Sequence, residues 1–298
     1  MVKLLHIGLT VGNGKWLSEA LSKRTIYAEI QPGESDDQIR SLFDSHKPEC
    51  VFMQIQRANG IGIELIKYMA SKAVLLNWSG DVRDPLPEWY FDFDKYCTTC
   101  FSNMRDVEAI GGEYLQIGID PTIYKKQEWK KSNDIVFMGN WSAGFPLSPY
   151  RFKAVDMLHN VYKDRFQLFG GWHGCTGNLM RNQDGEANVY SKSKIGISIS
   201  HFNIDRYFSD RLIRIMASGC FALSHHYEGI EKDFEIGTHL DTFKDLDELR
   251  QKINHYLTHE YERERIAAAG CELVHKNFTT DNMVNDILRI YEQTKSIY

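Results

Sequence analysis

The first part of the chain alternates short apolar runs with amphipathic stretches. Apolar runs of four to eight residues predict strands, and one-sided apolar stretches predict helices. The strands that we expect here are 2–9, 25–30, 50–55, 73–78, 98–102 and 113–116, and the helices are 15–22, 36–45, 62–71 and 105–110. Because alternating strands and helices form parallel sheets covered on both faces, residues 1–120 predict a Rossmann-like lobe.

The alternation restarts after a polar segment, 121–133, which we expect to be an interdomain linker. A second lobe is then predicted over residues 134–279. Its expected strands are 134–138, 166–169, 195–200 and 220–224, and its expected helices are 149–160, 209–218 and 245–257.

The last helix, within 280–298, has one apolar face and a capping acid, Asp281. The apolar positions are Met283, Val284, Ile287, Leu288 and Tyr291. This face would equally cover the second lobe, but we expect the helix to cross back and pack toward the first lobe.

Length and composition fit a two-domain globular protein. The chain has 298 residues and a formal net charge of -5, which argues mildly against a basic nucleic-acid sleeve. No apolar run approaches the ~18 residues of a membrane span, and the N-terminal segment does not resemble a signal peptide. The six cysteines are few and scattered, so we expect reduced thiols in a cytoplasmic protein.

The expected helix 209–218 carries the strongest candidate chemistry. Ser209 is a good N-cap, and Asp210 and Arg211 follow in the first turn. A helix N-terminus offers unpaired N–H groups, and guanidinium pairs bidentately with phosphate oxygens. This pattern predicts a diphosphate site. The alternative is that Arg211 and Arg214 are surface charges with Asp210 as a partner.

A glycine loop follows the first expected strand. Gly12, Asn13 and Gly14 stand where a Rossmann-like lobe brings its backbone to phosphate. The loop is not a dinucleotide fingerprint, because the third glycine position holds Leu17. A tight turn would explain the same residues.

An acidic residue follows the expected strand 73–78. Asp81 lies near the carboxyl end of that strand, where ligands of open α/β sheets bind, and it is placed to accept a proton from an acceptor hydroxyl. The alternative is a surface pair between Asp81 and Arg83.

Five further residues in the second lobe are candidate donor contacts. Gly171 permits close backbone approach, and Trp172 would pack on a base or sugar or else lie in the core. The remaining three flank the expected strand 195–200: Tyr190, Lys194 and His201. A lone histidine is more often structural than catalytic.

We expect no metal site. Cys97 and Cys100 form a C-x-x-C pair, but no second pair or H-x3-H spacing completes a zinc set. His225 and His226 are adjacent, so their side chains diverge. Cys97 and Cys100 are therefore interpreted as structural residues.

Several motifs of the second lobe together resemble a known family. They are FMGNW at 137–141, the helix containing Arg151, LFGGW at 168–172, SKSKIGISISH at 191–201, SDRLIRIMASG at 209–219, FEIG at 234–237 and DLDEL at 245–249. NWSGDVR at 77–83 and QIGIDP at 116–121 agree more loosely. The chain resembles group-1-type glycosyltransferases, and within them the branch of spore-maturation-type proteins.

The resemblance implies a GT-B architecture: two Rossmann-like α/β lobes facing a cleft, with donor nucleotide on the C-terminal lobe and acceptor on the N-terminal lobe. It implies transfer of a sugar from a nucleotide-sugar, foremost a UDP-sugar, to an acceptor hydroxyl. No metal or cofactor is expected, since the nucleotide-sugar is a substrate. Arg211, helped by Lys194 and the 12–14 loop, would neutralise the leaving diphosphate.

One position departs from the family. Many relatives carry a ribose-binding glutamate where this chain has Arg214, so either another residue, foremost Glu228, holds the ribose or the donor is unusual. The departure leaves open a non-catalytic nucleotide-sugar-binding protein, and the fold leaves open a sugar-nucleotide epimerase. A dehydrogenase is disfavoured by Leu17. The acceptor, whether glycan, protein, metabolite or modified DNA base, and the oligomeric state stay open.

Overall fold

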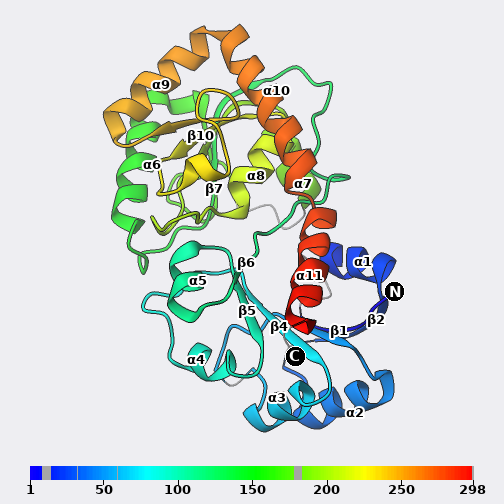
Figure 1. The fold of residues 1–298 in the computed structure, drawn as a ribbon. Helices are drawn as coiled ribbons and strands as arrows, with labels where there is room; N and C mark the ends of the chain where they lie inside the picture. Colours follow the sequence, from blue (N-terminus) through cyan, green and yellow to red (C-terminus); the bar gives the residue numbers. More distant parts are fainter. Residues whose placement is uncertain (9–14, 32, 59, 178–182, 297–298) are drawn as a thin grey trace. The chain divides into compact units, whose positions relative to one another are not determined.

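The computed structural model describes residues 1–8, 15–31, 33–58, 60–177 and 183–296. The chain forms two compact units (Figure 1). Unit 1 comprises residues 1–118 together with 280–298, and unit 2 comprises residues 119–279. Each unit is built around its own parallel sheet, so each is described separately.

Unit 1 contains a six-stranded parallel sheet in the order β2-β1-β3-β4-β5-β6. The strands are β1 (Lys3–Ile7), β2 (Ile26–Ile30), β3 (Cys50–Met53), β4 (Val74–Ser79), β5 (Thr98–Phe101) and β6 (Glu113–Tyr114). The helices are α1 (Lys15–Arg24), α2 (Asp36–His46), α3 (Ile63–Ala70), α4 (Trp89–Phe93), α5 (Met104–Ile110) and α11 (Thr280–Lys295).

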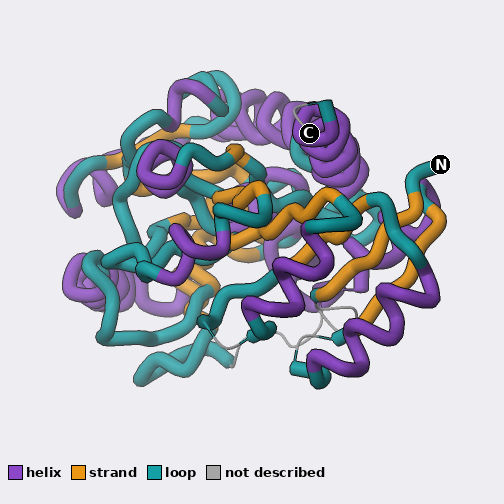
Figure 2. The backbone as a smooth tube through the Cα atoms, turned by 60° about the horizontal axis from the view of Figure 1, so that its bottom comes forward, coloured by secondary structure: helices purple, strands orange, loops and turns teal. Residues whose placement is uncertain are grey.

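Successive residues of β1 face opposite sides of this sheet. Leu4 packs in a cluster with residues of α1 and α11, whereas Leu5 packs in a cluster with residues of α2, α3 and α4. The strands therefore lie between two layers of helices, drawn as orange tubes among purple ones in Figure 2. This is the doubly covered sheet that the sequence predicts.

Helix α11 completes unit 1 although it lies far from the other elements in the sequence. Its apolar stripe is buried, with Met283 2% exposed and Ile287 0% exposed, against residues such as Leu17 and Leu76. The expected return of this helix to the first lobe is confirmed.

Unit 2 contains a five-stranded parallel sheet in the order β11-β10-β9-β7-β8. The strands are β7 (Asn133–Met138), β8 (Phe166–Phe169), β9 (Ser193–Ser198), β10 (Phe221–His225) and β11 (Asp241–Phe243). The main helices are α6 (Ser148–Tyr162), α7 (Gln183–Ser191), α8 (Asp210–Ala217), α9 (Leu246–Thr258) and α10 (Glu260–Asn277). Two Rossmann-like α/β units confirm the expected fold class.

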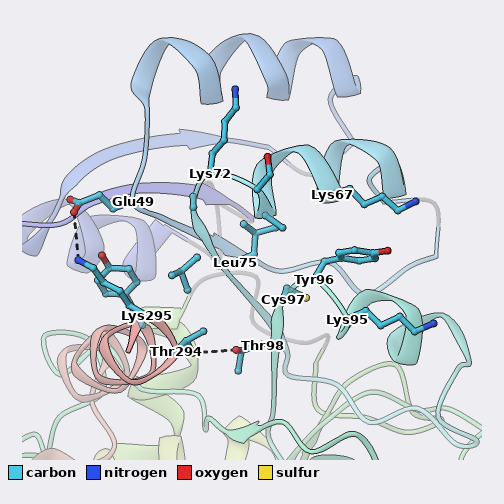
Figure 3. A pocket seen from close by; sticks show the side chains of 15 residues that line it. Glu49, Lys67, Lys72, Leu75, Lys95, Tyr96, Cys97, Thr98, Thr294 and Lys295 are labelled. Carbon is cyan, nitrogen blue, oxygen red and sulfur yellow. Dashed lines mark hydrogen bonds and ion pairs between the residues drawn. The ribbon is translucent and has the colours of Figure 1, made fainter. Parts of the chain in front are cut away.

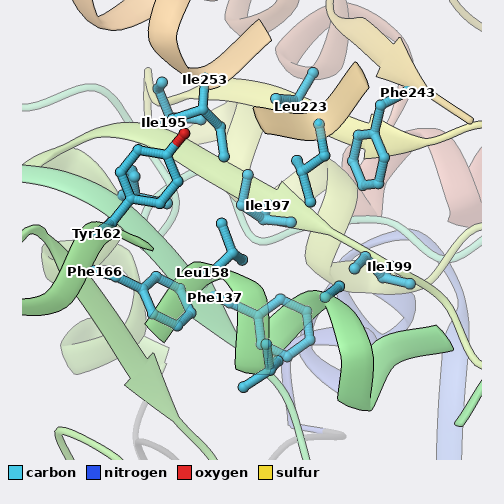
Figure 4. Packing of buried hydrophobic residues seen from close by; sticks show 14 of the residues in the cluster. Phe137, Leu158, Tyr162, Phe166, Ile195, Ile197, Ile199, Leu223, Phe243 and Ile253 are labelled. Carbon is cyan, nitrogen blue, oxygen red and sulfur yellow. The ribbon is translucent and has the colours of Figure 1, made fainter. Parts of the chain in front are cut away.

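Strand β9 organises the core of unit 2. Ile195 and Ile197 face α6 and α9, where they meet Leu158 and Ile253 (Figure 4). Between the two isoleucines, Gly196 faces α8: a methyl group there would lie 2.6 Å from Ile215 Cγ2. A glycine at this position lets α8 pack closely on the sheet.

Three elements of unit 2 differ from or add to the sequence expectations. Helix α10 was not expected because its apolar stripe is interrupted by charges; only a few positions such as Ile266 and Val274 are buried. Helix α7 and strand β11 were also not expected. The polar segment 121–132 packs on unit 2, since Tyr124 is 1% exposed and donates to Glu186 Oε2 at 2.7 Å.

Within the described parts of the chain, no helix combines the length and the apolar character needed to cross a membrane.

Candidate functional site

The candidate site lies at the carboxyl edge of the unit 2 sheet, where β7 and β9 end. Arg211, the second residue of α8, reaches back over both strand ends. Its Nε donates to the carbonyl oxygen of Met138, and its Nη1 donates to the carbonyl oxygen of Ile199 at 3.2 Å and to Ser209 Oγ at 3.3 Å. These three contacts fix the guanidinium at the edge where open α/β sheets bind ligands.

A second arginine lies beneath it. Arg151 on α6 is 1% exposed, and its Nη2 donates to the carbonyl oxygen of Asn140 at 3.2 Å. Its Nη1 contacts the ring nitrogens of His201, and its Cζ lies 5.5 Å from the centroid of the Phe137 ring. Among the described residues, Arg151 Nε has no hydrogen-bond partner.

The two guanidinium groups converge on Gly139, the residue after β7. A methyl group built on Gly139 would lie 2.7 Å from Arg211 Nη2 and 3.0 Å from Arg151 Nη2. Neither arginine forms an ion pair with any carboxylate that the structure describes. Two buried or half-buried positive charges therefore stand together without compensation, and a buried charge is normally paired.

The surroundings shift two titrations at this edge. Burial, together with the charge of Arg211, lowers the pKa of Arg151 to about 9. Burial and the two arginines lower the pKa of His201 to about 4, so its imidazole is neutral near pH 7. Both shifts show that the site resists further positive charge, and an anion would relieve this repulsion.

The start of α8 adds to the positive potential. Ser209 occupies the N-cap position, but its side chain makes no capping hydrogen bond and instead accepts from Arg211. The first N–H groups of a helix have no partner within the helix and carry a partial positive charge. Ser209 and Arg211 thus lie together at this edge, as the sequence predicts.

Glycines shape the backbone around the arginines. Gly170 has a φ of +122°, and a methyl group there would lie 2.0 Å from the carbonyl oxygen of Gly139. Only glycine allows the ends of β7 and β8 to approach in this way. The neighbouring Gly171 is exposed, with a φ of +76° and open space where a side chain would be.

Trp172 and Tyr190 are corrected as direct donor contacts. The indole of Trp172 is 7% exposed and packs edge-on against Phe137 and Phe152, so it offers no face to a base. Its Nε1 donates to the carbonyl oxygen of Gly139 at 2.7 Å, which supports the site from below. Tyr190 on α7 is 0% exposed, and burial raises its pKa.

Arg214 lies one turn further along α8, in a different environment. Its guanidinium pairs with Asp210 at 2.8 Å and with Glu186 at 3.1 Å, and Glu186 also accepts from Tyr124. Asp210 is therefore engaged within the protein. This arginine is compensated by two carboxylates, so the departure at position 214 adds no free positive charge.

Lys194 lies at the opposite edge of the sheet. Ser193 pairs with Asn133, the first residue of β7, and Lys194 Nζ donates to Asp134 Oδ1 at 2.6 Å. At about 3.3 Å per residue, Asp134 lies about 13 Å along β7 from Met138. The expectation that Lys194 assists Arg211 is wrong for this reason.

Glu228 follows β10 on an exposed loop. Its backbone N–H donates to Asn203 Oδ1 at 3.3 Å, and its side chain is exposed. The structure gives this carboxylate no contact with Arg211.

Asp81, the unit 1 candidate that the structure describes, lies at the carboxyl edge of its own sheet. Asp81 follows β4, its side chain is 70% exposed, and it lies 3.7 Å from Arg83. This is the surface pair that the sequence left as the alternative. Gly12, Asn13 and Gly14 lie outside the described residues.

A cavity of about 650 Å³ lies in unit 1, at the amino ends of β3, β4 and β5 (Figure 3). Its lining includes Leu75, Thr98 and Thr294, with lysines such as Lys72 and Lys295 at the rim. The cavity is at the edge of the sheet opposite to Asp81.

Cys97 and Cys100 are buried free thiols, and burial raises the pKa of both. Among the described residues, no group of three histidine, cysteine or acidic side chains is arranged to hold a metal ion.

Sequence reasoning placed Arg211, Ser209 and Gly171 at this edge but missed the contribution of Arg151. The helix that contains Arg151 belongs to the motifs that carry the resemblance, and a signal was therefore present. Its role became visible only from its burial beside Gly139, because neither spacing nor composition places residue 151 next to residue 211.

The two Rossmann-like units give the protein a GT-B fold, and the second unit has a cationic edge. A family model described as glycosyl transferase-like matches residues 151–289, just under half of the chain. The matched region contains Arg151, Arg211 and α8. Over these residues the chain is similar to glycosyltransferases, which are enzymes.

Solved structures share the whole fold. A glycosyltransferase from Rickettsia africae is 13% identical with a TM-score of 0.68, and the match covers 97% of each chain. HepE from Anabaena, in complex with UDP and glucose, is 10% identical with a TM-score of 0.68 over 97% of this chain and 99% of that chain. Sucrose-phosphate synthase from Thermosynechococcus elongatus is 9% identical with a TM-score of 0.67 over 99% and 100%. No curated protein matches the sequence.

Proposed function

We propose that this protein transfers a sugar from a UDP-sugar to an acceptor hydroxyl without a metal ion. The observation that carries this proposal is the pair of uncompensated guanidinium groups of Arg151 and Arg211 at Gly139. A diphosphate presents two adjacent anionic groups, and arginine pairs well with phosphate oxygens. The match to a UDP-bound neighbour supports uridine as the nucleoside.

Transfer breaks the bond between the sugar and the terminal phosphate oxygen, and negative charge develops on that oxygen. Arg211 at the surface of the site would contact this charge, while Arg151 below would raise the potential and hold the Asn140 carbonyl in place. Cations fixed before the reaction stabilise such a transition state without reorganising. In this scheme the arginines supply the charge that a metal ion supplies in other transferases.

Asp81 is our proposed acceptor-side base. It lies at the carboxyl edge of the unit 1 sheet with an exposed carboxylate, so it is accessible to a hydroxyl group. The acceptor class stays open among glycan, protein, metabolite and modified DNA base. We further propose that the protein belongs to the spore-maturation-type branch of these glycosyltransferases. Glu228 is our proposed contact to the ribose of the donor.

A thermal-shift panel of UDP-, GDP- and dTDP-sugars tests the donor. A ligand that binds only the folded state raises the melting temperature according to its affinity. We expect the UDP-sugars to give the largest shift, and the shift should disappear in Arg211→Met. No shift with any nucleotide-sugar would end the proposal.

Metal independence is tested on the active enzyme. Transfer should proceed unchanged in excess chelator, and loss of turnover that added Mg²⁺ or Mn²⁺ restores would overturn this part of the proposal.

A non-catalytic nucleotide-sugar-binding protein is the second candidate, because Arg214 replaces an expected ribose-binding glutamate. It would bind the donor with the same thermal shift but release no free UDP in the presence of acceptors. An epimerase would convert the donor sugar without any acceptor.

A further inference from the structure

The loop after β7 carries two exposed aromatic side chains beside the arginine pair. Trp141 is 53% exposed and Phe145 is 38% exposed. Large aromatic side chains bury 150–250 Å² each when they are covered, so two of them on one short loop offer a ligand a large apolar contact surface. Neither ring is needed to fill the core of unit 2.

Trp141 is held in place from one side only. Its ring stacks on the ring of Phe152 with centroids 5.6 Å apart and an interplanar angle of 5°. Its backbone N–H donates to the carbonyl oxygen of Gly170 at 3.0 Å. The indole is therefore pre-oriented, with one face packed on the protein and the other available to a flat apolar surface.

Phe145 is anchored on the other flank of Arg151. Its ring lies 4.2 Å from the ring of His201, the residue that Arg151 contacts. The backbone N–H of Leu147 donates to the carbonyl oxygen of His201 at 3.0 Å, which fixes this end of the loop.

The position of Trp141 relative to the guanidinium groups limits what it can touch. Asn140, which accepts from Arg151 Nη2, immediately precedes Trp141, and Phe152 immediately follows Arg151. The indole is thus linked to both segments that bear on the Arg151 guanidinium, the loop after β7 and helix α6. A ligand stacked on the indole would therefore lie next to this cationic edge.

In a nucleotide-sugar, the transferred sugar is bonded directly to the terminal phosphate, whereas the base is separated from the other phosphate by a ribose. A ring next to the cations therefore meets the sugar before the base. One face of a pyranose presents several C–H groups with a slight positive charge, and the face of an aromatic ring is negative.

We infer that Trp141 is a sugar-stacking residue that positions the transferred sugar over the diphosphate site, an inference that rests on the proposed function. It makes Trp141 a specificity-determining residue: sugars with an uninterrupted C–H face should bind better than epimers in which an axial hydroxyl interrupts that face.

The test measures binding of UDP and of the most tightly bound UDP-sugar by calorimetry, without acceptor, in the wild type and in Trp141→Ala. The variant should weaken UDP-sugar binding about tenfold, the upper range for one aromatic contact, and leave UDP binding within about twofold. Trp141→Phe should recover most of the loss. Circular dichroism confirms that each variant is folded.

Trp129 provides a matched control. It is 41% exposed and carries Lys192 over its ring at 4.5 Å, at the amino edge of the unit 2 sheet. Trp129→Ala should change neither affinity.

Three other outcomes would contradict the inference. Equal weakening of UDP and UDP-sugar by Trp141→Ala would place a base or ribose on the indole and overturn the inference. Unchanged binding of both ligands would overturn it as well, while wild-type UDP binding would leave the proposed function standing. If the wild type binds no nucleotide, the proposed function fails and the inference fails with it.

Discussion

The arginines at the carboxyl edges of the two sheets differ in whether carboxylates compensate their charge. In unit 1, Arg105 pairs with Asp84 at 3.4 Å and with Asp106 at 2.8 Å, and Arg83 lies near Asp81. In unit 2, the arginines at positions 151 and 211 lie side by side with no described carboxylate paired to either. The same edge of the same kind of fold is therefore balanced in one unit and strongly positive in the other.

This difference distinguishes arginines that sequence motifs alone do not. Arg211 and Arg214 lie three residues apart on one helix, yet only Arg214 is neutralised by the protein. The charge of Arg214 is compensated within the fold, whereas an uncompensated arginine is a candidate to bind an external anion. Four predictions test this difference between the two sheet edges.

The largest effect is expected on stability at the compensated arginine. Arg214→Met leaves the carboxylates of Glu186 and Asp210 without their cation, and removing one partner of a buried pair costs about 3–5 kcal/mol. Calorimetric melting measures the loss. Arg289→Met, which breaks the exposed pair with Asp286, is the control and should shift melting little.

The second effect concerns catalysis. Arg211→Met should lower the rate of sugar transfer about 10²- to 10³-fold, in the range seen for other lost charge-stabilising groups, without a comparable loss of stability. Steady-state kinetics with the UDP-sugar measures it. Arg165→Met, at the paired amino edge of the same sheet, serves as control; a similar loss in both variants would contradict the distinction.

The third effect is a pH dependence in unit 1. Burial lowers the pKa of His6 to about 4 from its usual 6.5, between the Tyr27 hydroxyl at 2.8 Å and Gln54 Oε1 at 3.2 Å. The folded state therefore binds fewer protons than the unfolded state below about pH 6.5. The contribution of neutral His6 to the free energy of unfolding is complete above that pH and is lost as the pH falls toward 4.

Between pH 7 and 5, this amounts to about 2 kcal/mol for His6. His6→Asn should flatten the dependence on pH of the unfolding free energy measured in urea. Some dependence should remain in this variant, because the pKa of His201 is also lowered. An unchanged slope would show that His6 is accessible to protons in the folded protein.

The smallest effect on stability is expected at Asp81. Its pair with Arg83 is exposed and 3.7 Å long, so Asp81→Asn should change the unfolding free energy by less than about 1 kcal/mol. The same change should reduce sugar transfer more than donor hydrolysis. Equal losses in both reactions would argue against acceptor-side chemistry for this residue.

Most of the fold was predictable because apolar runs of strand length alternate with one-sided helices in both units. The last helix was predictable as a helix from its stripe, and its packing in unit 1 is confirmed by burial of Met283 and Ile287. Helix α10 was not predictable from the sequence, because its surface is charged and its buried face includes small residues such as Gly270, so no clear apolar stripe is visible.

The candidate site was predictable only in part. Ser209 and Arg211 follow from local helix-start chemistry, which a sequence shows directly. Lys194 was assigned to the site although it precedes the expected strand 195–200, and the two ends of a strand lie at opposite edges of the sheet. Trp172 was misassigned since its burial depends on α6, far away in the sequence.

The division of unit 1 between residues 1–118 and 280–298 has a consequence for biosynthesis. On the ribosome, the six strands of the first sheet emerge early but must wait for some 160 later residues before α11 can cover Leu4, Leu17 and Leu76. Unit 2, continuous in the chain, is complete before that helix is made. A nascent chain thus holds one finished unit and one sheet with an uncovered apolar face, which is the stage at which chaperones would engage it.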